Sequence, residues 1–122
     1  MYKIGTDITE ISRIKKSLER AGFKERVYSA DEIKLLDEKK NKFESYAGNW
    51  AAKEAFSKAL GTGVRNFSLN EVEVLRNDLG KPYLRLSGNA LKCSAGLGFD
   101  VSISHTDTLA TAVVIAFKKE SV

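Results

Sequence analysis

The chain has 122 residues, 43% of them hydrophobic and 30% charged, which is typical of one soluble globular domain, residues 1–122, with a core of its own. No apolar run approaches the roughly 20 residues that span a bilayer, the N-terminus has no signal-peptide core, and the single cysteine excludes an internal disulfide, so we expect a cytoplasmic protein. The net charge of +4 is compatible with an acidic protein, a phosphorylated small molecule or nucleic acid as a partner, and does not choose among them.

The first elements of the chain are predicted to be a short strand and a basic amphipathic helix. The strand is expected at residues 2–8. The helix is expected at 9–22, where Thr9 would cap the start and Gly22 would close the end. The side of this helix opposite its apolar positions carries three cations: Arg13, Lys16 and Arg20.

Two more helices are predicted before the middle of the chain. Residues 29–40 begin with a capping-box pattern, Ser29 to Glu32, and should form a short helix. Residues 42–60 are apolar on nearly every side of a helix, so this third helix should be central in the fold. Along it runs a stripe of small residues, against which another backbone can pack closely: Ala51, Ala55 and Ala59.

The second half of the chain is predicted to be rich in strands. An alternating segment, a turn and a return strand are followed by a short helix or turn and by a closing hairpin, at 68–76, 77–82, 83–86, 87–96, 99–105 and 109–117. Helices and strands are segregated along the chain, and most connections are short. We therefore predict an α+β fold in which an antiparallel sheet packs with the long central helix.

The central helix carries charges where its apolar character predicts burial. Lys53, Glu54 and Lys58 lie in a stretch that is otherwise apolar or small. Unpaired charges in a protein interior are costly, so each should meet another protein charge, a metal or a charged ligand. These three side chains are therefore candidates for a functional site.

Two carboxylates are candidate metal ligands. Asp7 is expected where the first strand gives way to the helix, after Gly5, and Glu54 lies in the central helix. One or two carboxylates, completed by water and substrate phosphates, suit Mg²⁺. The alternatives are that Asp7 is only a helix-start or turn residue and that Glu54 only pairs with Lys58, four residues on. Spacing leaves both alternatives open.

Two further stretches carry weaker signals. His105 ends a predicted strand between Ser104 and Thr106, where it is either structural or able to bind a phosphate or move a proton. A serine hydrolase would need a G-x-S-x-G elbow, which is absent from the sequence. The segment 61–63, "GTG", either only closes the central helix or lets a ligand approach the backbone closely.

The basic face of the first helix is either a solvated surface or a docking site for an acidic helix of a partner protein. Nucleic acid fits less well, because no aromatic and basic interleaving or known binding motif accompanies these cations.

Four stretches taken in order resemble the holo-acyl-carrier-protein synthase family, the small 4′-phosphopantetheinyl transferases. They are "IGTDITEISRI" at 4–14, "WAAKEAFSKALGTG" at 50–63, "LGKPYL" at 79–84 and "VSISHT" at 101–106. The resemblance runs over nearly the whole chain, and it includes the G-x-D and W-x-x-K-E-A-x-x-K-A patterns of that family.

The resemblance implies roles for individual residues. Asp7 and Glu54 would bind Mg²⁺, which the pyrophosphate of coenzyme A also binds, and Lys58 would be the active-site lysine. Other residues match stretches that line the coenzyme A site: Gly61, Lys81, Pro82, Ser104, His105 and Thr106. Arg13 matches an arginine that grips the acyl carrier protein, and Lys16, Arg20 and Arg26 extend that surface. Some relatives carry an aspartate directly after the histidine, where this chain has Thr106.

The implied reaction moves the 4′-phosphopantetheine arm of coenzyme A onto a serine of apo-acyl carrier protein, for fatty acid biosynthesis, and releases adenosine 3′,5′-bisphosphate. Glu54, directly or through a metal-bound water, is the first candidate for the base, and His105 is the second. The charges of the central helix would then serve a metal and a pyrophosphate. The family also implies a homotrimer with active sites shared between subunits, and no nucleic-acid or membrane partner.

Three other functions remain open from the sequence. One is a non-enzymatic module that binds an acidic protein through the first helix, which leaves Glu54 and Lys58 unexplained. The second is another enzyme that uses coenzyme A, such as an acyltransferase. The third is a nucleic-acid binder, which would show a steep dependence on salt.

Overall fold

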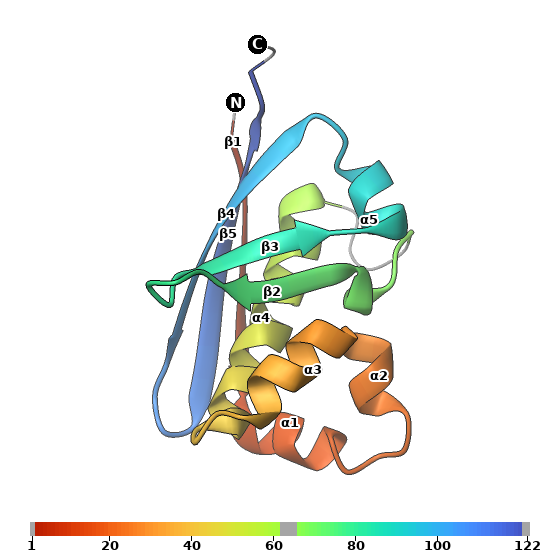
Figure 1. Ribbon diagram of the computed structural model, residues 1–122. Coiled ribbons are helices and arrows are strands. Elements are labelled where there is room, and N and C mark those ends of the chain that lie inside the picture. The colour runs from red at the N-terminus through yellow and green to blue at the C-terminus, as the bar shows by residue number, and fades with distance from the viewer. Residues whose placement is uncertain (1, 62–65, 121–122) are drawn as a thin grey trace.

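The computed structural model describes residues 2–61 and 66–120. In chain order its elements are β1 (Tyr2–Glu10), α1 (Ile11–Ser17), α2 (Phe23–Val27), α3 (Ala30–Asp37), α4 (Lys42–Leu60), a 3-10 turn η1 (Leu69–Glu71), β2 (Val72–Arg76), β3 (Pro82–Leu86), α5 (Gly88–Cys93), β4 (Leu97–His105) and β5 (Leu109–Lys118). The long helix α4 lies against a three-stranded sheet, and the β2–β3 hairpin covers it from another side (Figure 1). The predicted α+β fold is confirmed.

The three-stranded sheet is antiparallel, with β5 between β1 and β4. Alternate residues of β5 are buried against α4, and these are small: Ala110, Ala112, Val114 and Ala116. The other face of the sheet carries exposed apolar side chains. Small residues on the inner face let the helix lie close to the strands.

Helix α4 approaches β1 closely because both surfaces lack bulky side chains. A Cβ built on Gly5 would lie 2.6 Å from the backbone nitrogen of Ala59 and would also overlap the carbonyl of Ala55. Only a glycine therefore fits at this point of β1. The contact confirms that the predicted alanine stripe packs against another backbone.

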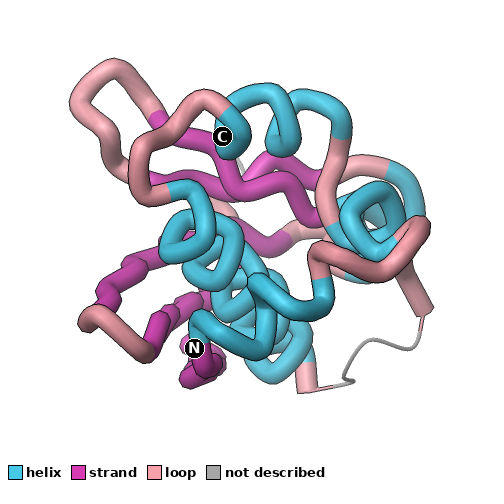
Figure 2. The backbone as a smooth tube through the Cα atoms, turned by 90° about the horizontal axis from the view of Figure 1, so that it is seen from below, coloured by secondary structure: helices cyan, strands magenta, loops and turns pink. Residues whose placement is uncertain are grey.

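A second part of the core lies around the N-terminal half of α4. Most of the side chains that fill it come from α1, α2, α3 and α4, while Tyr28 lies between α2 and α3 and Ala110 comes from β5. They include Ile14, Phe23, Leu36 and Tyr46. Figure 2 shows the helices packed together, with the three-stranded sheet along one side of them. This arrangement places α1, with its cations, beside the N-terminal half of α4.

The predicted elements are confirmed with two corrections near the N-terminus and one at 68–71, where the expected strand is replaced by the 3-10 turn η1, so that β2 begins only at Val72. The range 42–60 matches α4, and Ser29 and Glu32 form the capping box that begins α3. However, β1 continues to Glu10, so α1 begins later than expected and ends at Ser17. Gly22, with φ of 83°, precedes an additional short helix, α2. The pairing of β1 with β5 outcompetes the helix signal over residues 9 and 10.

None of the helices in the described part of the chain is both long enough and apolar enough to cross a membrane.

Candidate active site

Asp7 lies inside β1, opposite Ala112 of β5, and not at the junction of the strand and the helix. It is two residues from Gly5, so its side chain is on the same face of the sheet and points toward α4. Thr9, which was expected to cap the helix, is a strand residue, and its hydroxyl donates to Asp7 Oδ2 at 2.7 Å. The interpretation of Asp7 as a helix-start or turn residue is therefore wrong.

Lys58 joins α4 to β1. Its Nζ lies 3.2 Å from Asp7 Oδ1 and donates to the carbonyl of Thr6 at 3.0 Å. The Lys58 side chain remains half-exposed, whereas that of Asp7 is mostly buried. The ion pair of Lys58 is thus made with Asp7 across the fold, and not with Glu54 along the helix.

Glu54 is a half-buried carboxylate beside this pair. Burial raises its pKa, and the charge of Asp7 raises it further, whereas Lys58 and Arg13 act in the opposite direction. Among the described residues, the Glu54 carboxylate has no hydrogen bond and no ion pair within 4 Å. A carboxylate kept next to a second carboxylate, without a direct protein partner, is a group that a bound cation would stabilise.

The donor set fits Mg²⁺ better than a metal held wholly by protein. Within residues 2–61 and 66–120, no group of three or more His, Cys, Asp or Glu side chains is placed to hold a metal. Asp7 and Glu54 together offer two carboxylates. Mg²⁺ is commonly bound by one or two carboxylates and completed by water and substrate phosphates, so the two residues fit such a site.

The C-terminal candidate residues lie at the other edge of the sheet. Ser104 and His105 end β4, and β5 runs between them and β1. The His105 Nδ1 is 3.1 Å from the carbonyl of Thr106, whose hydroxyl accepts from the backbone of the β4–β5 turn. Two strand spacings of about 4.8 Å separate this edge from Asp7. Within one chain, His105 and Asp7 therefore lie two strands apart.

Ser104 and His105 cannot act as a serine–histidine pair. Successive residues of a strand point to opposite faces of the sheet, and both lie within β4. This geometry removes the serine hydrolase alternative for these two residues.

Lys81 and Pro82 line a surface hollow with residues of β4 and β5. The ammonium of Lys81 donates to Asp100 Oδ1 at 2.9 Å. Gly61 ends α4 with φ of 79° and has open space around it. The rest of the "GTG" segment, Thr62 and Gly63, lies outside the described residues.

The predicted partner surface adjoins the carboxylate cluster. Arg13, Lys16 and Arg20 are all exposed on or just after α1, and Arg26 is exposed on α2. Arg13 is close enough to lower the pKa of Glu54. The Arg20 guanidinium stacks over the ring of Phe23, 5.5 Å from its centroid. A protein docked on α1 would therefore reach the edge of the site.

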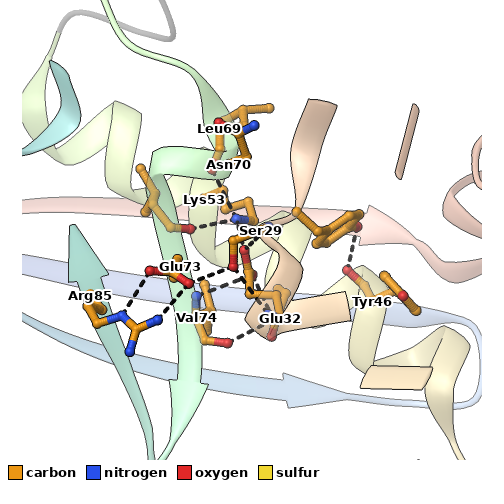
Figure 3. A network of polar contacts seen from close by, with 12 residues as sticks. Ser29, Glu32, Tyr46, Lys53, Leu69, Asn70, Glu73, Val74 and Arg85 are labelled. Carbon is orange, nitrogen blue, oxygen red and sulfur yellow. Dashed lines mark hydrogen bonds and ion pairs between the residues drawn. The ribbon is translucent and has the colours of Figure 1, made fainter. Parts of the chain in front are cut away.

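Lys53 does not belong to this cluster, although it precedes Glu54. It is fully buried, and its Nζ lies 2.7 Å from Glu32 Oε1 (Figure 3). The expectation that all charges of the central helix serve a metal and a pyrophosphate is therefore wrong for Lys53. Sequence reasoning missed Glu32 as its partner, because Glu32 was assigned only to the capping box.

Comparison with known proteins points to one protein family. A family model described as the 4′-phosphopantetheinyl transferase superfamily matches residues 3–114. A holo-[acyl-carrier-protein] synthase of Fusobacterium nucleatum is 45% identical over 116 residues, which cover 92% of this chain and 95% of that protein.

Solved structures of similar proteins share the fold. A holo-(acyl-carrier-protein) synthase from Bacillus anthracis, in complex with CoA (3′,5′-ADP), is 37% identical with a TM-score of 0.83, and the match covers 96% of each chain. A holo-[acyl-carrier-protein] synthase from Helicobacter pylori, in complex with coenzyme A, is 35% identical with a TM-score of 0.82, covering 93% of this chain and 99% of that one.

Proposed function

Because the chain belongs to the 4′-phosphopantetheinyl transferase superfamily, we propose that it transfers the 4′-phosphopantetheine arm of coenzyme A to a serine hydroxyl of an apo-acyl carrier protein. Adenosine 3′,5′-bisphosphate is the other product, and fatty acid biosynthesis is the pathway served. The observation that carries this proposal is the meeting of Asp7, Glu54 and Lys58 between β1 and α4.

The reaction forms a bond between the serine oxygen and the pantetheine-side phosphorus, and it breaks the bond from that phosphorus to the bridging oxygen of the pyrophosphate. Negative charge builds on the phosphate oxygens and on the leaving bisphosphate, so positioning and charge neutralisation do most of the catalysis. Lys58 contacts Asp7 and is half-exposed, so its ammonium can supply positive charge to the phosphate oxygens. Asp7 and Glu54 would hold Mg²⁺, which supplies Lewis-acid charge to the pyrophosphate.

The serine proton must go to a base. Glu54 is the first candidate, because its carboxylate has a raised pKa and has no hydrogen-bond partner among the described residues. His105 is the second candidate, and it would have to come from another subunit to act beside Asp7.

We also propose that the protein works as a homotrimer with active sites between subunits. The two groups of candidate residues lie at opposite edges of one sheet, and a neighbouring chain would bring the second group beside the first. The outer face of that sheet carries an exposed apolar patch: Ile4, Ile8, Val113 and Ile115. Ile4 and Ile8 are each 63% exposed. A contiguous patch of this kind is typical of a protein interface.

The carrier protein is expected to dock on the cations of α1 and α2. Carrier proteins in this role are acidic, and the exposed Arg13, Lys16, Arg20 and Arg26 complement such a surface. The charge of Arg13 lowers the pKa of Glu54, so the two side chains are near one another. A carrier protein docked at Arg13 would therefore bring its serine toward the carboxylates.

Intact mass spectrometry of an apo-acyl carrier protein tests the activity. After incubation with this protein, coenzyme A and Mg²⁺, the carrier should gain one phosphopantetheine mass, and EDTA should prevent the gain. Asp7→Ala and Glu54→Ala should each lower the rate by at least about 100-fold, because each removes transition-state charge stabilisation. No gain of mass with several carriers would reject the transferase, and a gain of an acyl group alone would point to an acyltransferase.

A further inference from the structure

The ammonium of Lys53 is completely enclosed by hydrogen-bond acceptors. Its Nζ donates to Glu32 Oε1 at 2.7 Å, to the carbonyl of Leu69 at 3.0 Å and to that of Val72 at 2.5 Å. The three protons of the ammonium thus have three partners, on α3, η1 and β2 (Figure 3). The ring of Tyr28 covers it at 5.4 Å. Each proton of the Lys53 ammonium therefore has its own hydrogen-bond acceptor.

Glu32 is equally enclosed. Besides Lys53, its carboxylate accepts from the backbone nitrogen of Ser29 at 3.0 Å, from Asn49 Nδ2 at 3.1 Å and from the backbone nitrogen of Val74 at 3.2 Å. Burial raises the pKa of Glu32 and lowers that of Lys53, while each partner opposes the shift of the other. The pair therefore ties α4 to α3 and to β2 through directional bonds.

The pair is on the side of α4 that faces away from β1. With about 100° of rotation per residue, Ala55 and Ala59, which touch Gly5, lie about 200° and 240° from Lys53. Glu54 and Lys58 lie about 100° and 140° from it, between the two contact faces. The rotation of α4 about its own axis therefore decides whether these two side chains meet Asp7.

The two contact faces constrain this rotation differently. The alanine stripe against Gly5 fixes how closely α4 approaches β1, but its methyl groups form no hydrogen bond that would specify the rotation of the helix. The hydrogen bonds of Lys53 and Glu32 are directional and weaken steeply when misaligned. Stability is a weak reason for such a pair, because well-packed apolar residues often replace a buried ion pair without loss.

We infer that Lys53 and Glu32 are positioning residues, which set the rotation of α4 so that Glu54 and Lys58 face Asp7. The inference rests on the proposed function, since it concerns the same site. The inference gives different roles to two adjacent residues of the W-x-x-K-E-A pattern. Glu54 belongs to the site, and Lys53, on the side of α4 that faces away from β1, orients the helix that carries Glu54.

The test replaces the charged pair by a neutral pair of similar volume, Lys53→Met with Glu32→Gln. The crystal structure of this variant should lose the contact between Lys58 Nζ and Asp7 Oδ1, which is 3.2 Å in the native chain. The rate constant kcat should fall by about 10- to 100-fold, since a misplacement of about 1 Å can cost 100-fold. KM for the carrier protein should stay unchanged, and magnesium-dependent binding of coenzyme A, measured by calorimetry, should weaken.

A matched control removes another charged contact, one that does not touch α4. Arg85 binds Glu73 on the far side of the same network (Figure 3), and it also binds Asp31. Arg85→Met should leave kcat and the Lys58 contact as they are in the native protein. A folded double variant with native kcat and a native Lys58–Asp7 contact would overturn the inference.

The single variant Lys53→Met carries the test if the double variant does not fold. It removes the three hydrogen bonds of the ammonium, leaves Glu32 with its three other donors, and the same contact and the same kcat are measured. The structural readout needs no activity. Native protein that transfers nothing would reject the proposed function, whereas an unchanged Lys58–Asp7 contact in the variant would reject the positioning role.

Discussion

Asp7 and Glu54 are both carboxylates of the proposed site, but their surroundings in the protein differ. Asp7 is held on both oxygens, by Thr9 and by Lys58. Glu54 has no such partner among the described residues, and burial and the neighbouring Asp7 raise its pKa. Carboxylates whose charged form is disfavoured by burial and by a neighbouring negative charge are common in active sites. They lower the stability of the folded protein but serve its function.

Replacing Glu54 by glutamine should therefore stabilise the protein at neutral pH while it removes activity. The folded-state pKa of Glu54 is raised, so its cost to folding is absent below the unfolded-state pKa, about 4.3. The cost grows as pH rises through that value and is complete above the raised pKa. Glu54→Gln should gain up to about 0.5 kcal/mol at pH 7 and nothing near pH 4.

Thermal unfolding from pH 4 to pH 8 measures this difference. Glu19→Gln, at an exposed position after α1, is the control and should show no comparable gain. A Glu54→Gln variant less stable than the native protein at pH 7 would mean that Glu54 makes a favourable contact in the folded state.

The elements β1 and α4 position the site through one close backbone contact. The alanine stripe of α4 and Gly5 of β1 bring the strand near enough for Lys58 to reach both Asp7 and the carbonyl of Thr6. The site thus depends on Gly5, which has no side chain and takes no part in the proposed reaction.

Gly5→Ala should consequently destabilise the protein by at least about 2 kcal/mol, because the new Cβ meets backbone atoms that cannot move away locally. Gly48→Ala is the matched control, since a Cβ there would lie 2.9 Å from the Cγ2 methyl of the Ile103 side chain, which can shift more easily than a backbone atom. The gain of helix propensity, about 1 kcal/mol, should offset that contact. Urea unfolding measures both variants, and equal losses would contradict the role given to Gly5.

The exposed face of α1 makes a separate prediction about the carrier protein. Arg13→Glu should lower the association rate by about 10-fold at low salt and reduce its salt dependence, because charges at the rim of an interface mainly steer encounter. The affinity for coenzyme A should stay nearly native. Lys92→Glu, on α5 at the other end of the molecule, is the control (Figure 1). Stopped-flow binding measures the rates, and an equal effect of both variants would exclude a specific docking face.

In the whole molecule, the proposed site is divided between two edges of one sheet. Asp7 lies on β1, His105 lies on β4, and β5 separates the two strands. The apolar outer face of this sheet, with Ile4 and Val113, is exposed in a single chain. Association of chains through that face would cover apolar surface and join the two halves of the site.

Mixed oligomers test this arrangement directly. If each site takes Asp7 from one chain and His105 from the next, Asp7→Ala and His105→Ala are each inactive alone but complement one another. Random mixing in a cyclic oligomer leaves about one quarter of the interfaces with both native residues, so about a quarter of native activity should return. Mass spectrometry of the carrier measures the recovery, and no recovery in a verified mixed oligomer would place the complete site within one chain.

Local signals in the sequence predicted the elements well. The apolar character of 42–60, the capping box at Ser29 and Glu32, and the alternating C-terminal hairpin all reappear in the structure. These signals depend on interactions within a few residues, which the sequence displays directly. The motifs that contain Asp7, Glu54 and Lys58 likewise identified the family from the chain alone.

The partner of each buried or half-buried charge depended on the tertiary structure. Lys58 pairs with Asp7, 51 residues away, and Lys53 pairs with Glu32, 21 residues away. Spacing leaves open whether Glu54 pairs with Lys58 along the helix or binds a metal, and it names no partner for Lys53. Which charge meets which is decided by the packing of distant segments, and local periodicity carries no information about that packing. The same holds for Thr9, which pairing with β5 keeps in a strand although its sequence is suited to a helix cap.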